Sequence, residues 1–322
     1  MSRAGKIWLI VAAVLVLAGI GLFAAATSMN HGQMVWKTSS NMVTNTYTIR
    51  DEFRNISIRC DTDEIVFVPA KDGKCTVEFY EYENEKHTAE VKNGTLEIAV
   101  AERNGKWTDH MSLVSGGIPK MTIALPESAY EALRIREDTG DIDLPAAFSF
   151  ETVDIEVSTG DVECGASASG RLQITTSTGG ITVKGLSAGE MALSVSTGTV
   201  RAESVQCKGD LSLHVSTGRS ELKDVTCRNF TSTGSTGKVG MKSLVAKEAI
   251  RIERSTGDVT FEGCDAEEIY VKTTTGDVSG TLLSDKVFLT ESDTGKIRVP
   301  KTITGGRCEI STDTGDIEFT VG

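Results

Sequence analysis

A Thr-Gly dipeptide recurs ten times between residues 139 and 315, always at steps of 19 or 20 residues. The residue before the threonine is Ser in six copies, Thr in one and Asp in three. Self-similarity at such a period is the sequence signature of a repeat architecture. We expect the repeated glycines to form tight structural turns, and they are Gly140, Gly160, Gly179, Gly198, Gly218, Gly237, Gly257, Gly276, Gly295 and Gly315.

Apolar residues alternate with polar ones on both sides of each Thr-Gly. Seven residues before the glycine all ten copies are apolar, and five before it eight of ten are Ile, Leu or Val. Two residues after it nine copies have Val or Ile, with Ser220 as the exception. This period of two predicts two half-buried strands joined by a bend. The pattern is least regular over residues 230–240, where a second Thr233-Gly234 intrudes and Ser232 replaces an apolar residue.

A repeat of this length cannot bury its own apolar face, so successive copies must stack and share one core. The sequence therefore predicts an all-β fold, a single-stranded, β-helix-like β-solenoid of about ten coils with 19 to 20 residues per coil. We expect the coils to stack in chain order, each advancing by the strand spacing of ~4.8 Å. Each glycine would then lie at a crowded bend where a Cβ would clash.

The three copies that read Asp-Thr-Gly resemble the catalytic triplet of aspartic proteases. They begin at Asp138, Asp293 and Asp313. However, seven of the ten equivalent positions carry a hydroxyl, so the position favours a short side chain that hydrogen-bonds to backbone. Stacking in chain order would also separate Asp138 from Asp313 by nine coils, on the order of 40 Å. We interpret the triplet as a bend.

Aspartates directly after the repeated glycine form a second row. Four of them make two pairs of neighbours, Asp141 with Asp161 and Asp258 with Asp277. Stacked carboxylates could bind calcium, which takes six to eight oxygen ligands, or raise one another's pKa for acid catalysis. The alternative function is therefore a calcium-stabilised or polysaccharide-processing β-helix. The simpler interpretation is that Asp is a common turn residue exposed to water.

The N-terminus contains a run of twenty residues without a charge, residues 7–26. It is long enough to cross a hydrocarbon core of about 30 Å and predicts one transmembrane helix. Arg3 and Lys6 precede the run and the next basic residue is Lys37, so residues 1–6 are expected in the cytoplasm and the rest outside. A cleaved signal peptide is the alternative, although its apolar segment is usually shorter.

The remaining chain divides by pattern. Residues 27–45 are polar and aperiodic, which predicts a stalk or linker. Residues 46–130 contain strand-like runs without the Thr-Gly repeat and are expected to cap the first coil, because an open coil end is an exposed sheet edge. Residues 131–322 hold the solenoid repeats, and no comparable cap follows them.

Charge and motifs exclude several function classes. Without Arg3 and Lys6, 31 basic residues face 45 acidic ones, a formal charge of −14 that argues against nucleic acid as a partner. The four histidines are dispersed, and no phosphate-binding loop, Gly-x-Ser-x-Gly elbow or His-Glu-x-x-His motif is present. The sequence predicts a chain that is not an enzyme, with no catalytic residue and no cofactor.

Seven cysteines are scattered through the chain without a Cys-x-x-Cys pair, so neither zinc nor a thioredoxin-like motif is supported. Free, buried cysteines acting as small apolar residues are one interpretation. A disulfide between Cys60 and Cys75 is the other, provided that their segments form a hairpin.

Several segments together are similar to one family. After the N-terminal apolar run come "ISIRCDTDEIVFVPAKDGKCTVEFY", the transition "MTIALPESAYEALRIREDTGDIDLP" and serial "STGDV" units. Over roughly residues 46–322 the chain resembles the bacterial putative-adhesin family, β-strand-repeat proteins whose domain function is not established. The resemblance implies a β-solenoid on the outer surface of a bacterial membrane, sometimes linked to envelope stress, and it carries over no catalytic residue.

The hypothesis from the sequence is a non-enzymatic, membrane-tethered, adhesin-like module of the bacterial envelope. Its long repetitive face would bind an envelope protein or glycan, or scaffold a signalling complex.

Overall fold

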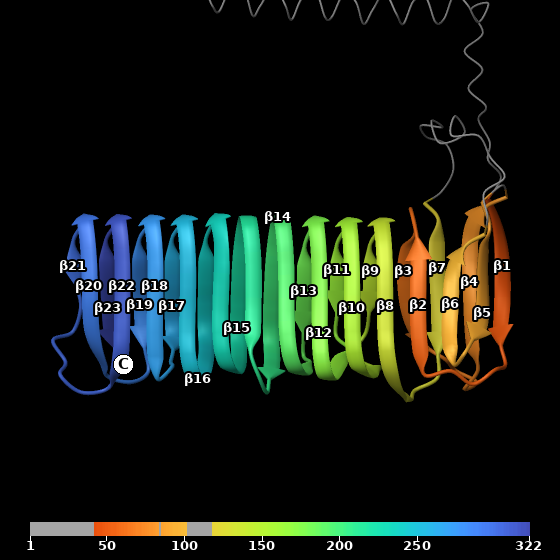
Figure 1. Ribbon diagram of the computed structural model, residues 1–322, viewed down its shortest axis with the longest axis horizontal. Coiled ribbons are helices and arrows are strands. Elements are labelled where there is room, and N and C mark those ends of the chain that lie inside the picture. Colours follow the sequence, from red (N-terminus) through yellow and green to blue (C-terminus); the bar gives the residue numbers. More distant parts are fainter. Residues whose placement is uncertain (1–41, 84, 102–117) are drawn as a thin grey trace, which may run out of the picture. The chain divides into compact units, whose positions relative to one another are not determined.

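The computed structural model describes residues 42–83, 85–101 and 118–322, and all regular structure in these ranges is β-strand (Figure 1). The predicted transmembrane helix lies outside the described residues, as do residues 27–41 of the predicted stalk. Within the described ranges, no helix is long and apolar enough to span a membrane. The predicted all-β fold and the solenoid are confirmed.

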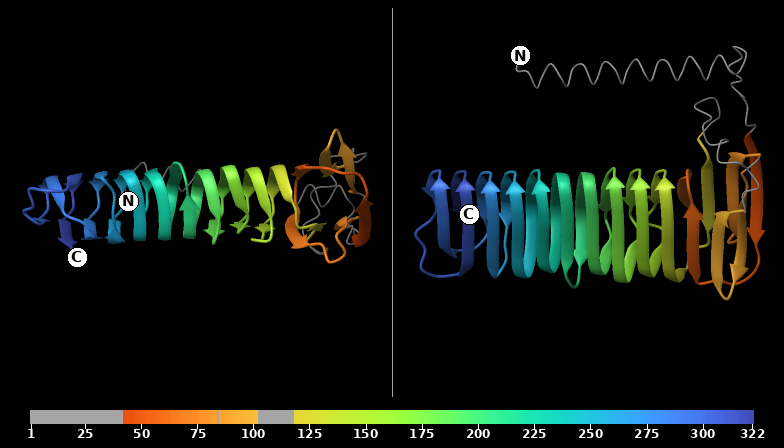
Figure 2. Two further views of the ribbon diagram at one scale, coloured as in Figure 1. Left: turned by 90° about the horizontal axis from the view of Figure 1, so that it is seen from below. Right: turned by 45° about the horizontal axis from the view of Figure 1, so that its top comes forward.

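Each repeat contributes one strand before the Thr-Gly bend and one after it, and equivalent strands pair in parallel (Figures 1 and 2). Where the ladder of hydrogen bonds continues through a bend of the coil, the strands on both sides of that bend form one long strand. The strands of the repeats are β8 (Ala129–Thr139), β9 (Ile142–Leu144), β10 (Ser149–Thr159), β11 (Val162–Cys164), β12 (Ser167–Thr178), β13 (Ile181–Lys184), β14 (Ser187–Cys207), β15 (Leu211–Thr236), β16 (Val239–Thr256), β17 (Val259–Cys264), β18 (Glu268–Thr275), β19 (Val278–Leu282), β20 (Lys286–Thr294), β21 (Ile297–Arg298), β22 (Gly306–Thr314) and β23 (Ile317–Val321).

The core runs through the inside of the coils. Side chains alternate between buried and exposed along each strand, so every second residue points inward. In-register pairing places like residues above one another, as with Ile135, Ile155 and Ile174 on three successive coils. All three side chains are fully buried. The period of two in the sequence thus becomes continuous apolar columns.

The N-terminal region extends the stack, first with parallel strands and then with antiparallel ones. β2 (Asn55–Cys60) pairs in parallel with β8, and β3 (Glu64–Pro69) pairs in parallel with β9, so these two strands form a coil without Thr-Gly. β6 (Thr95–Val100) and β7 (Lys120–Leu125) continue the stack on β2 and β3. Three antiparallel strands follow. β4 (Cys75–Tyr82) pairs with β7, and β1 (Met42–Ile49) pairs with β4. β5 (His87–Lys92) pairs with β6.

The expectation that the coils stack in chain order is wrong at the C-terminal end. β22 pairs with both β18 and β20, while β23 pairs with both β19 and β21. The last coil of the chain is therefore inserted between the two coils that precede it in sequence, and β20 and β21 form the outer edge (Figure 1). Asp138 and Asp313 are eight coils apart rather than nine.

Burial of apolar side chains explains this order. The inserted coil directs Ile310, Ile317 and Phe319 inward, and each is at most 3% exposed. The outer coil has the more polar Thr290 and Ser292 at its inward positions, and its Ile297 is 42% exposed. Placing the more polar coil outside leaves less apolar surface in water. The crossover back into the stack passes Gly305, where a Cβ would lie 1.8 Å from the carbonyl oxygen of Asp285.

All seven cysteines are free and buried. The segments of Cys60 and Cys75 do not form the hairpin that their disulfide required, because β4 pairs with β1 and β7 and not with β2. The disulfide prediction is therefore wrong, and the cysteines pack as small apolar residues.

Candidate functional site

The Thr-Gly bends stack so closely that only glycine fits. Eight of the ten repeated glycines have φ between 134° and 156°, a region that other residues rarely adopt. A Cβ at Gly257 would lie 2.0 Å from the carbonyl oxygen of Gly237, the equivalent glycine one coil earlier. At Gly140 the clash would be with the carbonyl oxygen of Asp63, whose turn replaces Thr-Gly in the preceding coil.

The aspartates after the glycines hydrogen-bond along the stack. Asp141 Oδ1 accepts the backbone N–H of Asp161 at 2.8 Å, and Asp161 Oδ1 accepts that of Gly180 at 2.6 Å. Asp258 and Asp277 repeat the arrangement, and Asp277 Oδ1 accepts the N–H of Asp316 at 2.8 Å. Each carboxylate thus satisfies a bend N–H on the next coil, which is why Asp recurs at this position.

The structure places the four candidate calcium ligands as two separate pairs of neighbours. One oxygen of each carboxylate is occupied by the N–H of the next coil. Asp258 also faces Lys238 Nζ at 2.7 Å, and this ion pair holds the pKa of the carboxyl below its usual range. These contacts show that the aspartates stabilise the stacked bends, and they leave few carboxylate oxygens free to bind an ion.

The three Asp-Thr-Gly aspartates, Asp138, Asp293 and Asp313, are all exposed and point away from the core. Nothing in the described residues brings Asp138 near the other two. The structure is consistent with the triplet being a bend.

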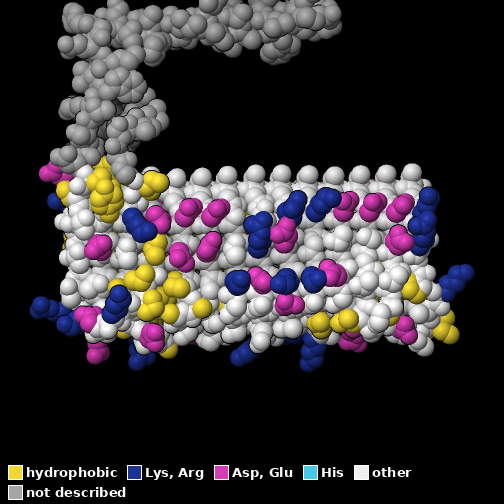
Figure 3. All heavy atoms as spheres, turned by 180° about the vertical axis from the view of Figure 1, so that it is seen from behind, with side chains coloured by type: hydrophobic (Ala, Val, Ile, Leu, Met, Phe, Trp, Pro, Cys, Tyr) yellow, Lys and Arg dark blue, Asp and Glu magenta, His cyan; other side chains and the backbone are white. Residues whose placement is uncertain are grey.

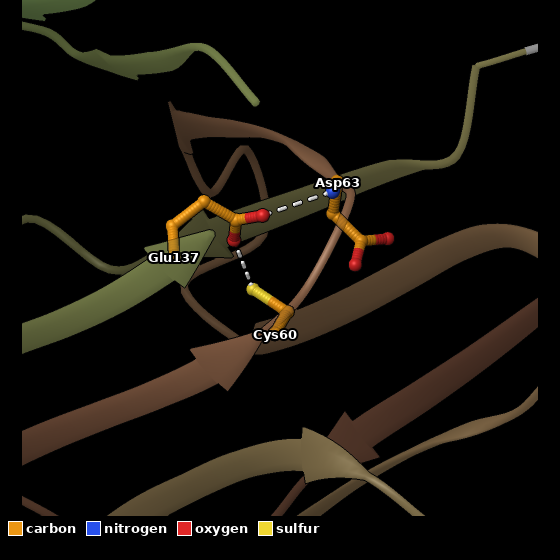
Figure 4. A group of neighbouring side chains, drawn as sticks. All are labelled: Cys60, Asp63 and Glu137. Atoms are coloured by element: carbon orange, nitrogen blue, oxygen red, sulfur yellow. Dashed lines mark hydrogen bonds between the residues drawn. The ribbon is translucent and has the colours of Figure 1, made fainter. Parts of the chain in front are cut away.

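A buried polar cluster lies where the first Thr-Gly coil meets the coil formed by β2 and β3 (Figure 4). Its members come from separate elements: Cys60 ends β2, Asp63 lies in the turn after it, and Glu137 is in β8. Glu81 in β4 and His87 at the start of β5 complete it. All five are at most 4% exposed. Burial of so many titratable side chains requires close mutual pairing.

Hydrogen bonds join these five residues in one chain. Glu137 accepts the thiol of Cys60 and, at 3.1 Å, the backbone N–H of Asp63. The Asp63 carboxylate contacts His87 Nε2 at 3.1 Å, and His87 Nδ1 lies 2.8 Å from Glu81 Oε2. The His87 ring is fixed between two carboxylates, so it is a donor on both sides when protonated.

Burial and charge displace the pKa values of the cluster. Burial raises the pKa of Glu137 to about 7, although hydrogen bonds from Cys60 and the Asp63 amide oppose the change. Burial acts to lower the pKa of His87, but the carboxylates of Asp63 and Glu81 outweigh it and the pKa is raised. Burial, with Glu137 nearby, also raises the pKa of the Cys60 thiol. The two carboxylates therefore favour the protonated form of His87, and Glu137 titrates near neutral pH.

Cys60, Asp63 and Glu137 also offer three donor atoms within 4.8 Å of one another, the one such group in the part of the chain that the structure describes. A thiolate and two carboxylates can bind a divalent cation. Here every donor already has a partner within the protein, and the thiol of Cys60 donates to Glu137. The arrangement supports proton sharing more directly than metal binding.

The repeat pattern of the sequence does not reveal this cluster, although it contains one signal. Glu137 lies three residues before its repeat glycine, an inward position held by Val157, Val195 and Val215 on other coils. A carboxylate in an inward column requires a buried partner. The partners themselves lie in the segment without repeats, where no period locates them.

A hollow of about 580 Å³ opens on the face that follows the bends, over β14 to β17 and β19. Acidic and basic side chains form rows along one face of the solenoid (Figure 3). Gly240 and Gly280 lack side chains at this point, and the buried residues beneath are Ala202, Leu222, Met241 and Phe261. The rim consists of Arg201, Glu203, Glu221, Lys223, Lys242 and Glu262.

Ion pairs between coils link the charges of this rim. Arg201 Nε lies 3.0 Å from Glu221, and Lys223 Nζ lies 3.0 Å from Glu203. Lys242 pairs with Glu262 on the next coil. Because these side chains are largely exposed, each pair contributes little to stability. Their effect is to arrange both signs of charge around the hollow.

Comparison with solved structures finds bacterial proteins of low sequence identity. A putative adhesin from Parabacteroides distasonis has 11% identity and a TM-score of 0.49, and covers 88% of this chain and 98% of its own. A putative lipid binding protein from the same species has 15% identity and a TM-score of 0.46, with the same coverage. A putative adhesin from Bacteroides fragilis has 15% identity and a TM-score of 0.38, again with this coverage.

No curated protein matches the chain. A family match, in contrast, covers most of it, in two overlapping stretches at residues 53–218 and 209–321. Together these stretches contain the coil of β2 and β3, the buried cluster and every Thr-Gly bend. The chain therefore belongs to the Toastrack DUF4097 family.

Proposed function

We propose that the protein is a non-enzymatic, adhesin-like binding module, tethered to the bacterial membrane by residues 7–26 with its solenoid outside the cell. The observation that carries the proposal is the hollow with its charged rim on a continuous face of stacked coils. Two features of the sequence support the location: the uncharged apolar run, and Arg3 and Lys6 directly before it with no basic residue after it until Lys37.

The chemistry of the hollow favours a protein partner over a glycan. Glycan sites commonly use exposed aromatic rings, but the one aromatic of this hollow, Phe261, is 2% exposed. Its rim instead presents guanidinium, ammonium and carboxylate groups at close spacing. Such a surface suits an extended protein segment of mixed charge, because complementary charge provides specificity.

Proximity crosslinking in the native cell tests the proposal. A photo-crosslinking residue at Thr260, exposed within the hollow, should capture a partner from the envelope. The matched control is Lys272, which is exposed on β18 before the bend. Capture of the same partner at both positions, or of none at Thr260, would contradict the site. A glycan as the captured species would replace the protein partner.

An activity assay tests the non-enzymatic part separately. The purified full-length chain should cleave neither polysaccharide nor peptide libraries. Cleavage that is lost in Asp141→Asn or Asp277→Asn would show instead that the row of aspartates is catalytic.

A further inference from the structure

Among the described residues, three buried side chains carry or can carry a positive charge, and they differ in the groups that they contact. His87 lies between the carboxylates of Asp63 and Glu81. Lys286 Nζ lies 2.7 Å from Asp265 Oδ1. Arg254 is 5% exposed, yet its hydrogen-bond acceptors are all neutral, and no carboxylate of the described residues forms an ion pair with it. A buried charge without a counter-charge is costly.

The residues that interrupt the regular repeat, Ser220, Ser232 and Gly234, surround the guanidinium of Arg254. Arg254 Nη1 donates to the carbonyl oxygen of Val215 at 2.8 Å. The same nitrogen would lie 2.0 Å from a Cβ at position 234, so only glycine leaves room for it. Arg254 Nη2 donates to Ser232 at 2.9 Å and to Ser220 at 3.3 Å. The two serines that break the apolar pattern are therefore ligands of one arginine.

Arg254 Nε has no hydrogen-bond partner in the described structure, and neither has the hydroxyl of Thr273. The two residues are register partners on successive coils, β16 and β18, in the column three residues before the repeat glycine. Threonines in the same column elsewhere are satisfied, because Thr176 and Thr312 donate to the carbonyl oxygens of Gly160 and Gly276. Two neighbouring buried donors thus lack an acceptor.

We propose that Arg254 and Thr273 form a buried binding site for a small inorganic anion of the chloride class. Nε–H can only donate, and the threonine hydroxyl can turn to donate, so an anion between them accepts from both. It would also supply the negative charge that the guanidinium lacks. Burial lowers the pKa of Arg254 only to about 10, so the group remains a cation at neutral pH. A water molecule would satisfy the hydrogen bonds and leave the charge unbalanced.

Bromide provides the direct test, because it replaces chloride and is visible by anomalous diffraction. Crystals of the full-length protein, refolded and grown in sodium bromide, should show a bromide within hydrogen-bonding distance of Arg254 Nε and Thr273 Oγ1. Thr273→Val should lose or strongly weaken this peak. Thr312→Val is the matched control, since it removes an equally buried hydroxyl of the same column whose partner is a carbonyl oxygen.

Melting experiments give a second readout. A ligand that binds only the folded state raises Tm with its concentration. The Tm of the full-length protein and of Thr312→Val should rise as chloride replaces gluconate at constant ionic strength, and that of Thr273→Val should not. A water in place of bromide, or the same chloride dependence in Thr273→Val as in Thr312→Val, would overturn the proposal.

Discussion

Glu137 accepts the backbone N–H of Asp63 at 3.1 Å and thereby joins the first Thr-Gly coil to the coil before it. The same residue is 3% exposed, and no cationic side chain of the described residues pairs with its carboxyl group, because His87 contacts Asp63 and Glu81 instead. The junction between the N-terminal region and the repeats therefore depends on a proton near neutral pH.

We predict that Glu137 makes the protein less stable as the pH rises. Its folded pKa of about 7 is raised from 4.5, so its contribution is fully present below pH 4.5 and is lost as the pH rises through 7. The shift corresponds to on the order of 3 kcal/mol in the free energy of unfolding. His87, whose pKa is also raised, acts in the same direction. Chemical denaturation of the full-length chain between pH 4.5 and 8 measures the slope.

Glu137→Gln should flatten that slope, because the amide keeps an acceptor oxygen for the Asp63 N–H and cannot ionise. Above pH 7 the variant should be more stable than the wild type. Glu156→Gln is the control, since this glutamate is exposed on β10 and pairs with Arg136 at the surface. An unchanged slope in Glu137→Gln would show that the pKa of Glu137 is not raised.

The second prediction concerns the bends. Gly257→Ala should destabilise the protein by more than about 3 kcal/mol, because the new Cβ meets a backbone oxygen at 2.0 Å in addition to the unfavourable φ. Gly185→Ala should cost only about 1 kcal/mol, since its φ is +64° and nothing lies within 4 Å of the added atom. Urea denaturation compares the two, and equal costs would contradict the close stacking.

The solenoid could be predicted from the sequence because its constraints are local. Alternation at Leu133, Ile135 and Ile142 recurs with each glycine, and a period of two combined with a fixed repeat length leaves few other folds. The order of the last two coils could not be predicted from the sequence, because both coils follow the same pattern. Five residues before the repeat glycine, most copies have an aliphatic residue, such as Ile310, but the earlier of the two coils has Thr290. This polar residue was a local sign that the earlier coil lies outside.

The buried cluster was beyond sequence analysis for a different reason. Asp63, Glu81 and His87 meet because β4 and β5 fold back antiparallel over the coil end, and such distant pairing has no period to reveal it. Similarly, Ser220 and Ser232 were visible as exceptions, but their shared cause, Arg254, lies on another coil. Deviations from a repeat mark buried polar groups more reliably than they identify the partner.

The third prediction addresses the row of aspartates. Asp277→Ala should cost about 0.5–1.5 kcal/mol, because the N–H of Asp316 loses its acceptor, whereas Asp277→Asn should cost less since the amide oxygen replaces it. Calcium or chelator should leave the Tm of the wild type unchanged. A Tm that falls with chelator, in the wild type but not in Asp277→Ala, would restore the calcium interpretation.

The fourth prediction tests the inserted coil with two opposite substitutions at one repeat position. Ile310→Thr should cost about 1–3 kcal/mol in the free energy of unfolding, because it removes apolar volume and buries a hydroxyl in a coil enclosed on both sides. Thr290→Ile should change stability by less than about 1 kcal/mol, because the outer coil leaves this position partly exposed. If the coils instead stacked in chain order, the coil of Thr290 would be the enclosed one and that of Ile310 the edge. Thr290→Ile would then fill a buried column and increase stability, while Ile310→Thr would be the mild substitution, so urea denaturation of the pair decides between the two orders.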